Sequence, residues 1–301
     1  MHGHLIVLNA TSGRGIRPDV RNHIRELYEA AGVAAEIELV APGRSAGKAM
    51  RAAAARRPDV LVAGGGDGTL SAAAAVLADT GIPLGVLPLG TRNHFARDLG
   101  IPLELDAAIA AAIGGVPRLI DVGEVNGEVF VNNASIGVYP AVVRLRQQYQ
   151  GRGAGKWLPM AWAALAVTRR RPFLGVRLIV DGAPMLRRTP FVFVGNNEYR
   201  MEGVRAAQRE TLDGGVLAVY MMNASGRRSL LWLAFQVLAG RTRELGELDR
   251  LHATEVTVET RRRHLQVARD GEVTTMAAPL TFRIRPKSLT VLVPAEADAH
   301  G

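Results

Sequence analysis

The chain of 301 residues is long enough for two ordinary domains, and its 48% hydrophobic and 22% charged residues are typical of a globular protein. It contains no cysteine, which excludes disulfides, thiolate metal sites and cysteine nucleophiles. Its formal net charge of +9 suits an anionic partner, such as nucleic acid, anionic lipid headgroups or nucleotide phosphates. We identify no signal peptide and no apolar stretch near the ~20 residues that cross a bilayer, and we therefore expect a soluble, cytoplasmic protein.

The first part of the chain alternates short apolar runs with helical patterns. Strands are expected at 4–9, 35–40, 59–63 and 82–87, and helices at 21–31, 47–57 and 71–78. This alternation predicts an α/β domain with a mainly parallel sheet. Nucleotide sites in such sheets lie beyond the carboxyl ends of the strands. The polar turn with Asn9 and Ser12 is expected at that edge, together with Gly64–Thr69 and Gly90.

The most informative stretch is the glycine turn between the strand at 59–63 and the helix that follows it. It contains Gly64, Gly65, Gly66, Asp67, Gly68 and Thr69. Glycines let a ligand approach the backbone amides, and a helix that begins here would point its free N–H groups at an anion such as phosphate. A carboxylate at Asp67 would repel phosphate unless a metal ion or a reacting hydroxyl lies between them. An ordinary βα turn is the alternative.

The Gly-Gly-Asp-Gly-Thr order resembles the nucleotide loop of diacylglycerol and sphingosine kinases, of NAD kinases and, more distantly, of phosphofructokinases. The pentad alone does not choose among them. The next turn, Pro88–Arg97, reads Pro-Leu-Gly-Thr-x-Asn-x-Phe-Ala-Arg. Its Thr91 and Asn93 can bond phosphate or ribose oxygens, although Thr91 can also be a plain helix cap.

The stretch 88–97 resembles the second signature of the diacylglycerol kinase catalytic-domain family, which NAD kinases do not carry. That family usually has Asp where this chain has His94. This difference concerns an acidic role at that position and leaves the loop itself unaffected.

From Arg118 onward, short strands follow one another. They are expected at 119–125, 129–133, 176–180, 191–194, 216–221, 255–259, 264–268 and 280–284, with helices at 141–150, 156–169 and 229–239. Asp181-Gly182 and Asp270-Gly271 are typical of hairpin turns. Many short strands at close spacing predict an antiparallel β-sandwich.

We therefore expect a nucleotide-binding domain at 1–122 and a β-sandwich acceptor domain at 123–287. A closing strand at 288–294 resembles the segment that returns to the first domain in the family, and a disordered tail is expected at 295–301.

The resemblance extends through this second part. The stretch 120–137 resembles the family's interdomain segment, and Gly195-Asn196 resembles its Gly-Asn motif, although 198–203 replaces the usual glycine-rich run. Asp213 resembles a residue of a structural magnesium site, which the carbonyls of Glu210 and Gly215 would complete; a turn aspartate is the alternative.

Arg269–Glu272, read alone, is a hairpin turn. In the family, an Asp-Gly-Glu turn presents a carboxylate to the nucleotide cleft, which would make Glu272 the general base.

The resemblance implies a lipid kinase that transfers the γ-phosphate of ATP, with magnesium, to a hydroxyl of a diacylglycerol-like or sphingoid lipid. The glycines and Thr69 of the first turn, with Gly90, Thr91 and Asn93, would hold the nucleotide, and Asp67 would organise magnesium. The basic surface, with Trp157 and Trp162, could hold the chain at an anionic membrane, although core positions are the alternative for both tryptophans.

We expect no nucleic acid partner, because the basic residues are not clustered on a helix or interleaved with aromatic residues. An NAD kinase, and a nucleotide-binding or nucleic-acid-binding protein without catalysis, remain the alternatives. The acceptor lipid and the oligomeric state stay open.

Overall fold

The computed structural model describes residues 3–9, 18–41, 43–138, 140, 173–202, 205–209, 211–222 and 248–295. They fall into two compact units, residues 1–122 with 286–301, and residues 123–285. Strands β5 (Val116–Val125) and β18 (Leu280–Val293) each contribute residues to both units. The expected helices at 141–150, 156–169 and 229–239, with Trp157 and Trp162, and the tail beyond residue 295 lie outside the described residues.

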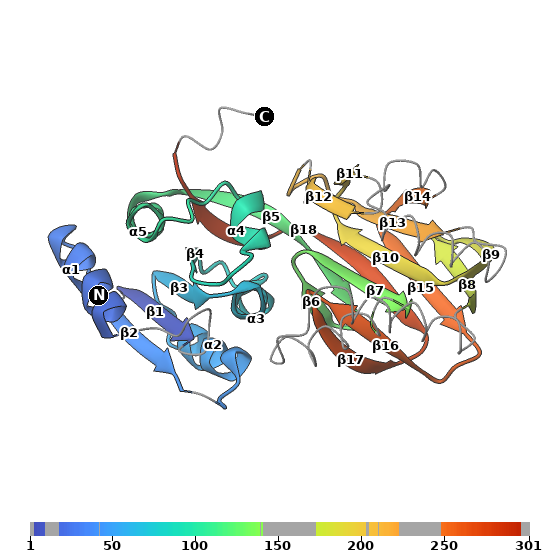
Figure 1. The fold of residues 1–301 in the computed structure, drawn as a ribbon, viewed down its shortest axis with the longest axis horizontal. Helices are drawn as coiled ribbons and strands as arrows, with labels where there is room; N and C mark the ends of the chain where they lie inside the picture. The colour runs from blue at the N-terminus through green and yellow to red at the C-terminus, as the bar shows by residue number, and fades with distance from the viewer. Residues whose placement is uncertain are drawn as a thin grey trace, which may run out of the picture. The chain divides into compact units, whose positions relative to one another are not determined.

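The first unit is a parallel sheet with helices on both faces (Figure 1). Its strands lie in the order β2 (Ala35–Val40), β1 (His4–Asn9), β3 (Val60–Gly65) and β4 (Leu84–Pro88), followed by the end of β18, where Val291 pairs with Leu84. Helices α1 (Pro18–Ala30) and α5 (Leu105–Gly114) pack together, as do α2 (Ala46–Ala55) and α3 (Asp67–Leu77). The short α4 spans His94–Asp98.

The strand sequences explain this layered arrangement. Every residue of β3 and β4 is buried, as expected for strands that are covered by helices on both faces. The chain passes from β1 outward to β2 and then back past β1 to β3. The strand order therefore reverses between β1 and β3, and ligands of open α/β sheets bind at such a point, beyond the carboxyl ends of the strands. Asn9 and Gly65 are the last residues of these two strands.

The second unit contains two antiparallel sheets. The six-stranded sheet has the order β14 (Leu248–Ala253), β13 (Leu217–Met222), β10 (Phe191–Asn196), β7 (Asn133–Gly137), β16 (His264–Arg269) and β17 (Glu272–Ala277). The other continues from β18 in the order β15 (Glu255–Thr260), β8 (Leu174–Val180) and β9 (Ala183–Thr189), and through β18 it is continuous with the parallel strands of the first unit. Strand β5 pairs with β18 and with β6 (Glu128–Phe130). A separate hairpin joins β11 (Tyr199–Glu202) to β12 (Arg205–Arg209).

One apolar core joins the two sheets of this unit. It takes Ile136, Val192 and Val267 from the six-stranded sheet, and Leu178 and Phe282 from the other, all nearly or fully buried. These residues alternate along their strands with more exposed ones, the pattern of a sandwich with one buried face per sheet. The predicted fold class, a mainly parallel α/β domain followed by an antiparallel sandwich, is confirmed.

The turn predictions succeeded where the sequence carries a strong signal. Asp181-Gly182 and Asp270-Gly271 both form two-residue hairpin turns, with positive φ at all four residues. Asn126-Gly127 forms a third such turn between β5 and β6, which our reading of the sequence did not identify.

One strand prediction was wrong. The expected strand at 129–133 is interrupted at Val131 and Asn132, so that β6 ends before the turn and β7 begins after it. The closing stretch at 288–294 is a strand as far as Val293, and it is the end of the longer β18, which begins at Leu280 and pairs with β4 of the first unit.

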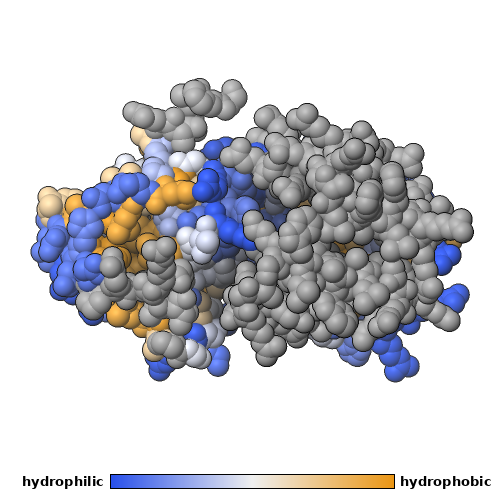
Figure 2. Space-filling view, in the orientation of Figure 1, coloured by the Kyte–Doolittle hydropathy of each residue, from blue (hydrophilic) through white to orange (hydrophobic). Residues whose placement is uncertain are grey.

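The surface of the first unit carries both hydrophilic and hydrophobic residues (Figure 2). Leu39, Leu103 and Leu119 are among its exposed large apolar side chains. Within the described ranges, no helix combines the length and the apolar character needed to span a membrane.

The Asp181 carboxylate gives this fold a measurable pH dependence. Its Oδ1 accepts hydrogen bonds from Thr254 N at 3.0 Å, Thr254 Oγ1 at 2.9 Å and Glu255 N at 2.9 Å. The backbone hydrogen bond from Glu255 is the largest cause of a pKa lowered from 3.8. A lowered pKa contributes stability above the unfolded-state pKa, and this stability is lost as pH falls through the folded-state pKa.

We therefore expect the melting temperature of Asp181→Asn at pH 7 to be about 1–3 °C lower than that of the parent protein. The difference should shrink as the pH falls below about 3.8. Thermal unfolding followed by circular dichroism from pH 7 to pH 3 measures this, with Asp249→Asn as the control. A constant difference across the pH range would contradict the assignment.

Candidate functional site

Two loops of the first unit meet at the carboxyl ends of β3 and β4. Leu89 N donates to Gly65 O at 2.9 Å. A Cβ placed on Gly90 would lie 2.5 Å from the Cα of Gly66, a distance that real Cβ atoms essentially never show. The two loops can therefore pack backbone against backbone because position 90 is glycine, whereas a Cβ on Gly66 would lie 3.4 Å from the Cα of Gly90.

The first loop leads directly into α3, whose N-cap is Gly66, without a side-chain cap. Gly66 O accepts the amide hydrogens of Thr69 at 2.9 Å and Leu70 at 3.1 Å. The amides that precede Thr69 in the first turn have no acceptor within the helix, and the positive end of the helix dipole points the same way. This end of α3 is therefore suited to an anion, as predicted for Gly64–Thr69.

Asn9 and Thr69 connect the loop to the neighbouring strand. Asn9 Nδ2 donates to Thr69 Oγ1 at 2.9 Å, and Thr69 is almost fully buried. This bond lies at the place where the strand order reverses. Ser12, the other predicted residue of this turn, lies outside the described residues.

Asn93 shapes the second loop from within. It is buried and left-handed, with φ of 52°. Its Oδ1 accepts from Gly90 N at 3.0 Å, and its Nδ2 donates to Pro88 O at 3.1 Å and to Gly90 O at 3.0 Å. The N-cap of α4 is Asn93, so that the alternative of Thr91 as a helix cap is wrong; Thr91 is exposed.

Asp67 joins the two loops. It is the first residue of α3, is half-buried, and its Oδ1 accepts from Phe95 N of α4 at 3.3 Å. One carboxylate with phosphate oxygens and water is a normal set of ligands for Mg²⁺, and the chemistry of Asp67 fits it. Within the described part of the chain, no group of three or more His, Cys, Asp or Glu side chains is placed to hold a metal ion.

The second unit positions a different carboxylate. Asp270, at the tip of the β16–β17 hairpin, accepts backbone hydrogen bonds from Val131 N at 2.9 Å, Asn132 N at 2.8 Å and Asn133 N at 3.1 Å. Asp270 N in turn donates to Asn133 O at 2.9 Å. Glu272, two residues later, begins β17 and is exposed. Glu272, the predicted base, therefore lies two residues after Asp270, whose carboxylate holds the hairpin in place.

The carbonyl groups of Val131 and Asn132 also form hydrogen bonds with side chains. Asn196 Nδ2 donates to Val131 O at 2.9 Å, and the Tyr199 hydroxyl donates to Asn132 O at 3.0 Å. Arg209, which is buried, also donates to Val131 O. Sequence reasoning missed this network because its donors come from β10, β11 and β12, far away along the chain.

The predicted magnesium set at 210–215 is only partly described. Asp213 is exposed, Gly215 has φ of +69°, and Glu210 lies outside the described residues. Asn197 N donates to Val216 O at 3.0 Å and closes the adjoining turn. The set therefore stays a prediction.

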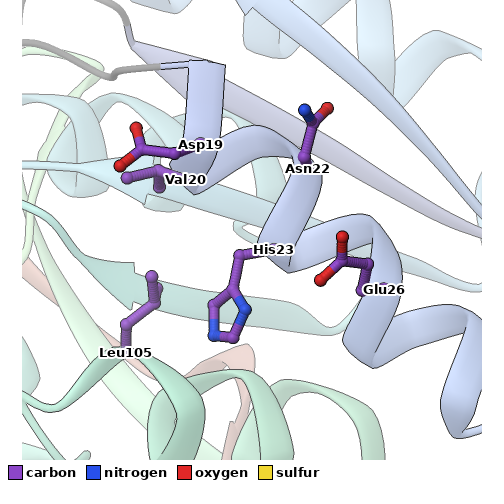
Figure 3. A pocket seen from close by; sticks show the side chains of 6 residues that line it. All are labelled: Asp19, Val20, Asn22, His23, Glu26 and Leu105. Carbon is purple, nitrogen blue, oxygen red and sulfur yellow. The ribbon is translucent and has the colours of Figure 1, made fainter.

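A separate cavity of about 520 Å³ lies at α1 and the start of α5 (Figure 3). Asp19, His23, Glu26 and Leu105 help to line it, and none of the predicted site residues does. His23 Nε2 lies 2.5 Å from Asp106 Oδ1, and this hydrogen bond is the main cause of a raised His23 pKa.

Comparison with known families gives two matches that together cover most of the chain. Residues 4–125 match the diacylglycerol kinase catalytic domain. Residues 133–293 match the YegS C-terminal NAD kinase beta sandwich-like domain.

Individual relatives agree with these matches. The chain is 30% identical over 255 residues to a diacylglycerol kinase of Mycobacterium tuberculosis, covering 81% of this chain and 80% of that one. It is 41% identical over 135 residues to the diacylglycerol kinase of Bacillus subtilis, but this match covers only 44% of this chain and 45% of the relative. The fold is similar to a crystal structure of a putative diacylglycerol kinase from Bacillus anthracis, with a TM-score of 0.74, 21% identity and 98% coverage of both chains.

The contacts of Asp270 predict a clear effect on stability. Asp270→Ala removes a carboxylate that accepts three backbone hydrogen bonds, and should lower the free energy of unfolding by roughly 2–4 kcal/mol. Glu272→Ala, an exposed change on the same hairpin, should stay within about 0.5 kcal/mol of the parent protein. Urea denaturation measures both. Equal destabilisation by the two variants would contradict the role given to Asp270.

Proposed function

The chain belongs to the diacylglycerol kinase catalytic-domain family of lipid kinases, and from this premise we propose that it transfers the γ-phosphate of ATP to a lipid hydroxyl. The observation that carries the proposal is the pair of glycine loops after β3 and β4, next to the place where the strand order reverses between β1 and β3. In this proposal the first unit binds the nucleotide and the second unit binds the acceptor.

The nucleotide phosphates would bind the backbone of Gly64–Gly68 at the start of α3. Exposed Gly68 and Thr91 are accessible to a ligand, whereas Thr69 and Asn93 are buried. We therefore assign Asn9, Thr69 and Asn93 to shaping the two loops, because their side chains form hydrogen bonds within the protein itself. Glycine at position 90 lets the two loops approach each other, and glycine at 64 and 65 leaves room for the side chains of Leu8 and Thr69.

Two carboxylates would take part in the chemistry. Asp67 would hold Mg²⁺ through the oxygen that does not accept from Phe95 N, and the ion would neutralise charge on the phosphates. Glu272 would accept the proton of the attacking hydroxyl, since it is exposed at a hairpin tip that Asp270 holds in place. Positioning and charge neutralisation provide most of the rate in phosphoryl transfer.

The proposed acceptor is a diacylglycerol-like or sphingoid lipid. Relatives named diacylglycerol kinase and probable lipid kinase support this chemical class. A lipid acceptor implies work at an anionic membrane surface, which the net charge of +9 favours.

Replacing Gly90 tests the contact between the loops. The Cβ of Gly90→Ala would lie 2.5 Å from the Cα of Gly66, and the backbone must shift to relieve this overlap. Affinity for a non-hydrolysable ATP analogue should fall about tenfold or more, measured by isothermal titration calorimetry. Gly114→Ala is the matched control, because a Cβ there meets nothing within 4 Å. Unchanged affinity of Gly90→Ala would place the nucleotide elsewhere.

The activity itself is tested with purified protein, ATP and magnesium, using lipids in mixed micelles and NAD as alternative acceptors. We expect a phosphorylated diacylglycerol-like or sphingoid lipid and no NADP.

Glu272→Gln should lower turnover by ~10²–10⁴-fold and leave ATP binding intact, because it keeps the shape of the side chain but cannot take a proton.

Two outcomes would contradict this account. NADP formed faster than any lipid product would identify an NAD kinase. Loss of ATP binding with turnover retained in Glu272→Gln would make Glu272 a nucleotide ligand instead of the base.

A further inference from the structure

The turn between β15 and β16 carries three consecutive arginines, Arg261, Arg262 and Arg263. All three are exposed, and so is His264, which begins β16. Among the residues that the structure describes, none of the three guanidinium groups has an ion-pair partner. The turn is therefore an uncompensated concentration of positive charge.

Three other arginines of the same unit are paired with carboxylates. Arg177 Nη1 lies 3.2 Å from Glu259 Oε2, Arg283 Nε lies 2.6 Å from Glu255 Oε2, and Arg269 Nη1 lies 3.1 Å from Glu128 Oε2. The carboxylates on the strands next to the turn are thus already paired with other cations. The contrast separates the arginine turn from the ordinary charged surface of the sandwich.

The backbone fixes this turn beside a second exposed turn. Ala278 N donates to Arg263 O at 2.9 Å, which joins the arginine turn to the uncharged Ala277–Pro279 turn that leads into β18. Asn126 holds this second turn, because its Nδ2 donates to Ala277 O at 3.2 Å and to Pro279 O at 3.1 Å. The two turns together carry cations and small apolar residues and no acidic side chain.

We propose that the Arg261–Arg263 turn is the surface by which the protein docks on an anionic membrane. This inference rests on the proposed function, since a lipid acceptor requires contact with a bilayer. Anionic headgroups attract each basic side chain that lies near the membrane surface, so that three adjacent cations act together. The β16–β17 hairpin runs from this turn to Glu272, over roughly 20 Å at the usual rise of a strand. Docking would thus anchor one end of the hairpin that carries the proposed base at its opposite end.

Sedimentation with vesicles tests the docking without any need for turnover. The vesicles contain equal parts of phosphatidylglycerol and phosphatidylcholine, or phosphatidylcholine alone. The triple variant R261A/R262A/R263A should bind the anionic vesicles about 10²-fold more weakly, since each basic residue near the surface contributes about fivefold. R261K/R262K/R263K should keep most of the binding, which shows that the fold is intact and that charge is what matters.

The matched control removes three positive charges from the other unit, as R44A/K48A/R51A, where all three residues are exposed. This variant should bind within a few-fold of the parent protein. Equal losses in the two alanine triples would overturn the proposal, because net charge alone would then explain binding. Unchanged binding of R261A/R262A/R263A to the anionic vesicles would also overturn it. So would a variant that binds duplex DNA more weakly than the parent protein but binds the vesicles equally well.

Failure of the docking surface and failure of the proposed function give different results. With a short-chain, water-soluble diacylglycerol, the parent and R261A/R262A/R263A should have equal turnover, because docking is then unnecessary. Lipid phosphorylation with unchanged vesicle binding in the variant would reject the docking surface alone. Absence of lipid phosphorylation with the expected loss of vesicle binding would reject the kinase assignment and leave the docking surface in place.

Discussion

The close approach of Gly66 to Gly90 is the constraint on which the candidate site depends. A Cβ at Gly90 would come within 2.5 Å of the Gly66 Cα, so that any other residue there would force the loops after β3 and β4 apart. Around this contact, Asp67 accepts from Phe95 N, and Leu89 N donates to Gly65 O. The amides of Leu89, Gly90 and Phe95 are used in this way within the protein, so that the second loop is held in a fixed position beside the start of α3, where the helix can bind an anion.

In the second unit a carboxylate, and not a pair of glycines, holds two distant segments of the chain together. Asp270 gathers the amides of Val131, Asn132 and Asn133, while Asn196 and Tyr199 bind the carbonyls of the same turn. The hairpin that presents Glu272 is thereby tied to the start of β7 by groups that are distant along the chain. A side chain that acts on a substrate needs such support, because loosely held groups lose much of the benefit of positioning.

Local signals in the sequence predicted local structure well. The apolar run before Gly64, the glycine loop and the two Asp-Gly turns each specify a backbone conformation within a few residues, and the structure has them. The predicted strand at 129–133 failed because its interruption depends on Asp270, which lies almost 140 residues later. Asn93 looked like a ligand from its position, but its amide is used within its own loop, a geometry that spacing cannot reveal. The roles of Asp67 and Glu272 remain predictions, since they depend on a bound substrate.

Hydrogen–deuterium exchange with and without magnesium and a non-hydrolysable ATP analogue tests the central claim most directly. The claim is that the two glycine loops of the first unit together hold the nucleotide phosphates. The account predicts that binding slows exchange at the amides of 64–70 and 90–95 together, because one ligand contacts both loops. Slowed exchange centred on 19–26 and 105–106, around the cavity beside His23, with no change in the glycine loops, would contradict it.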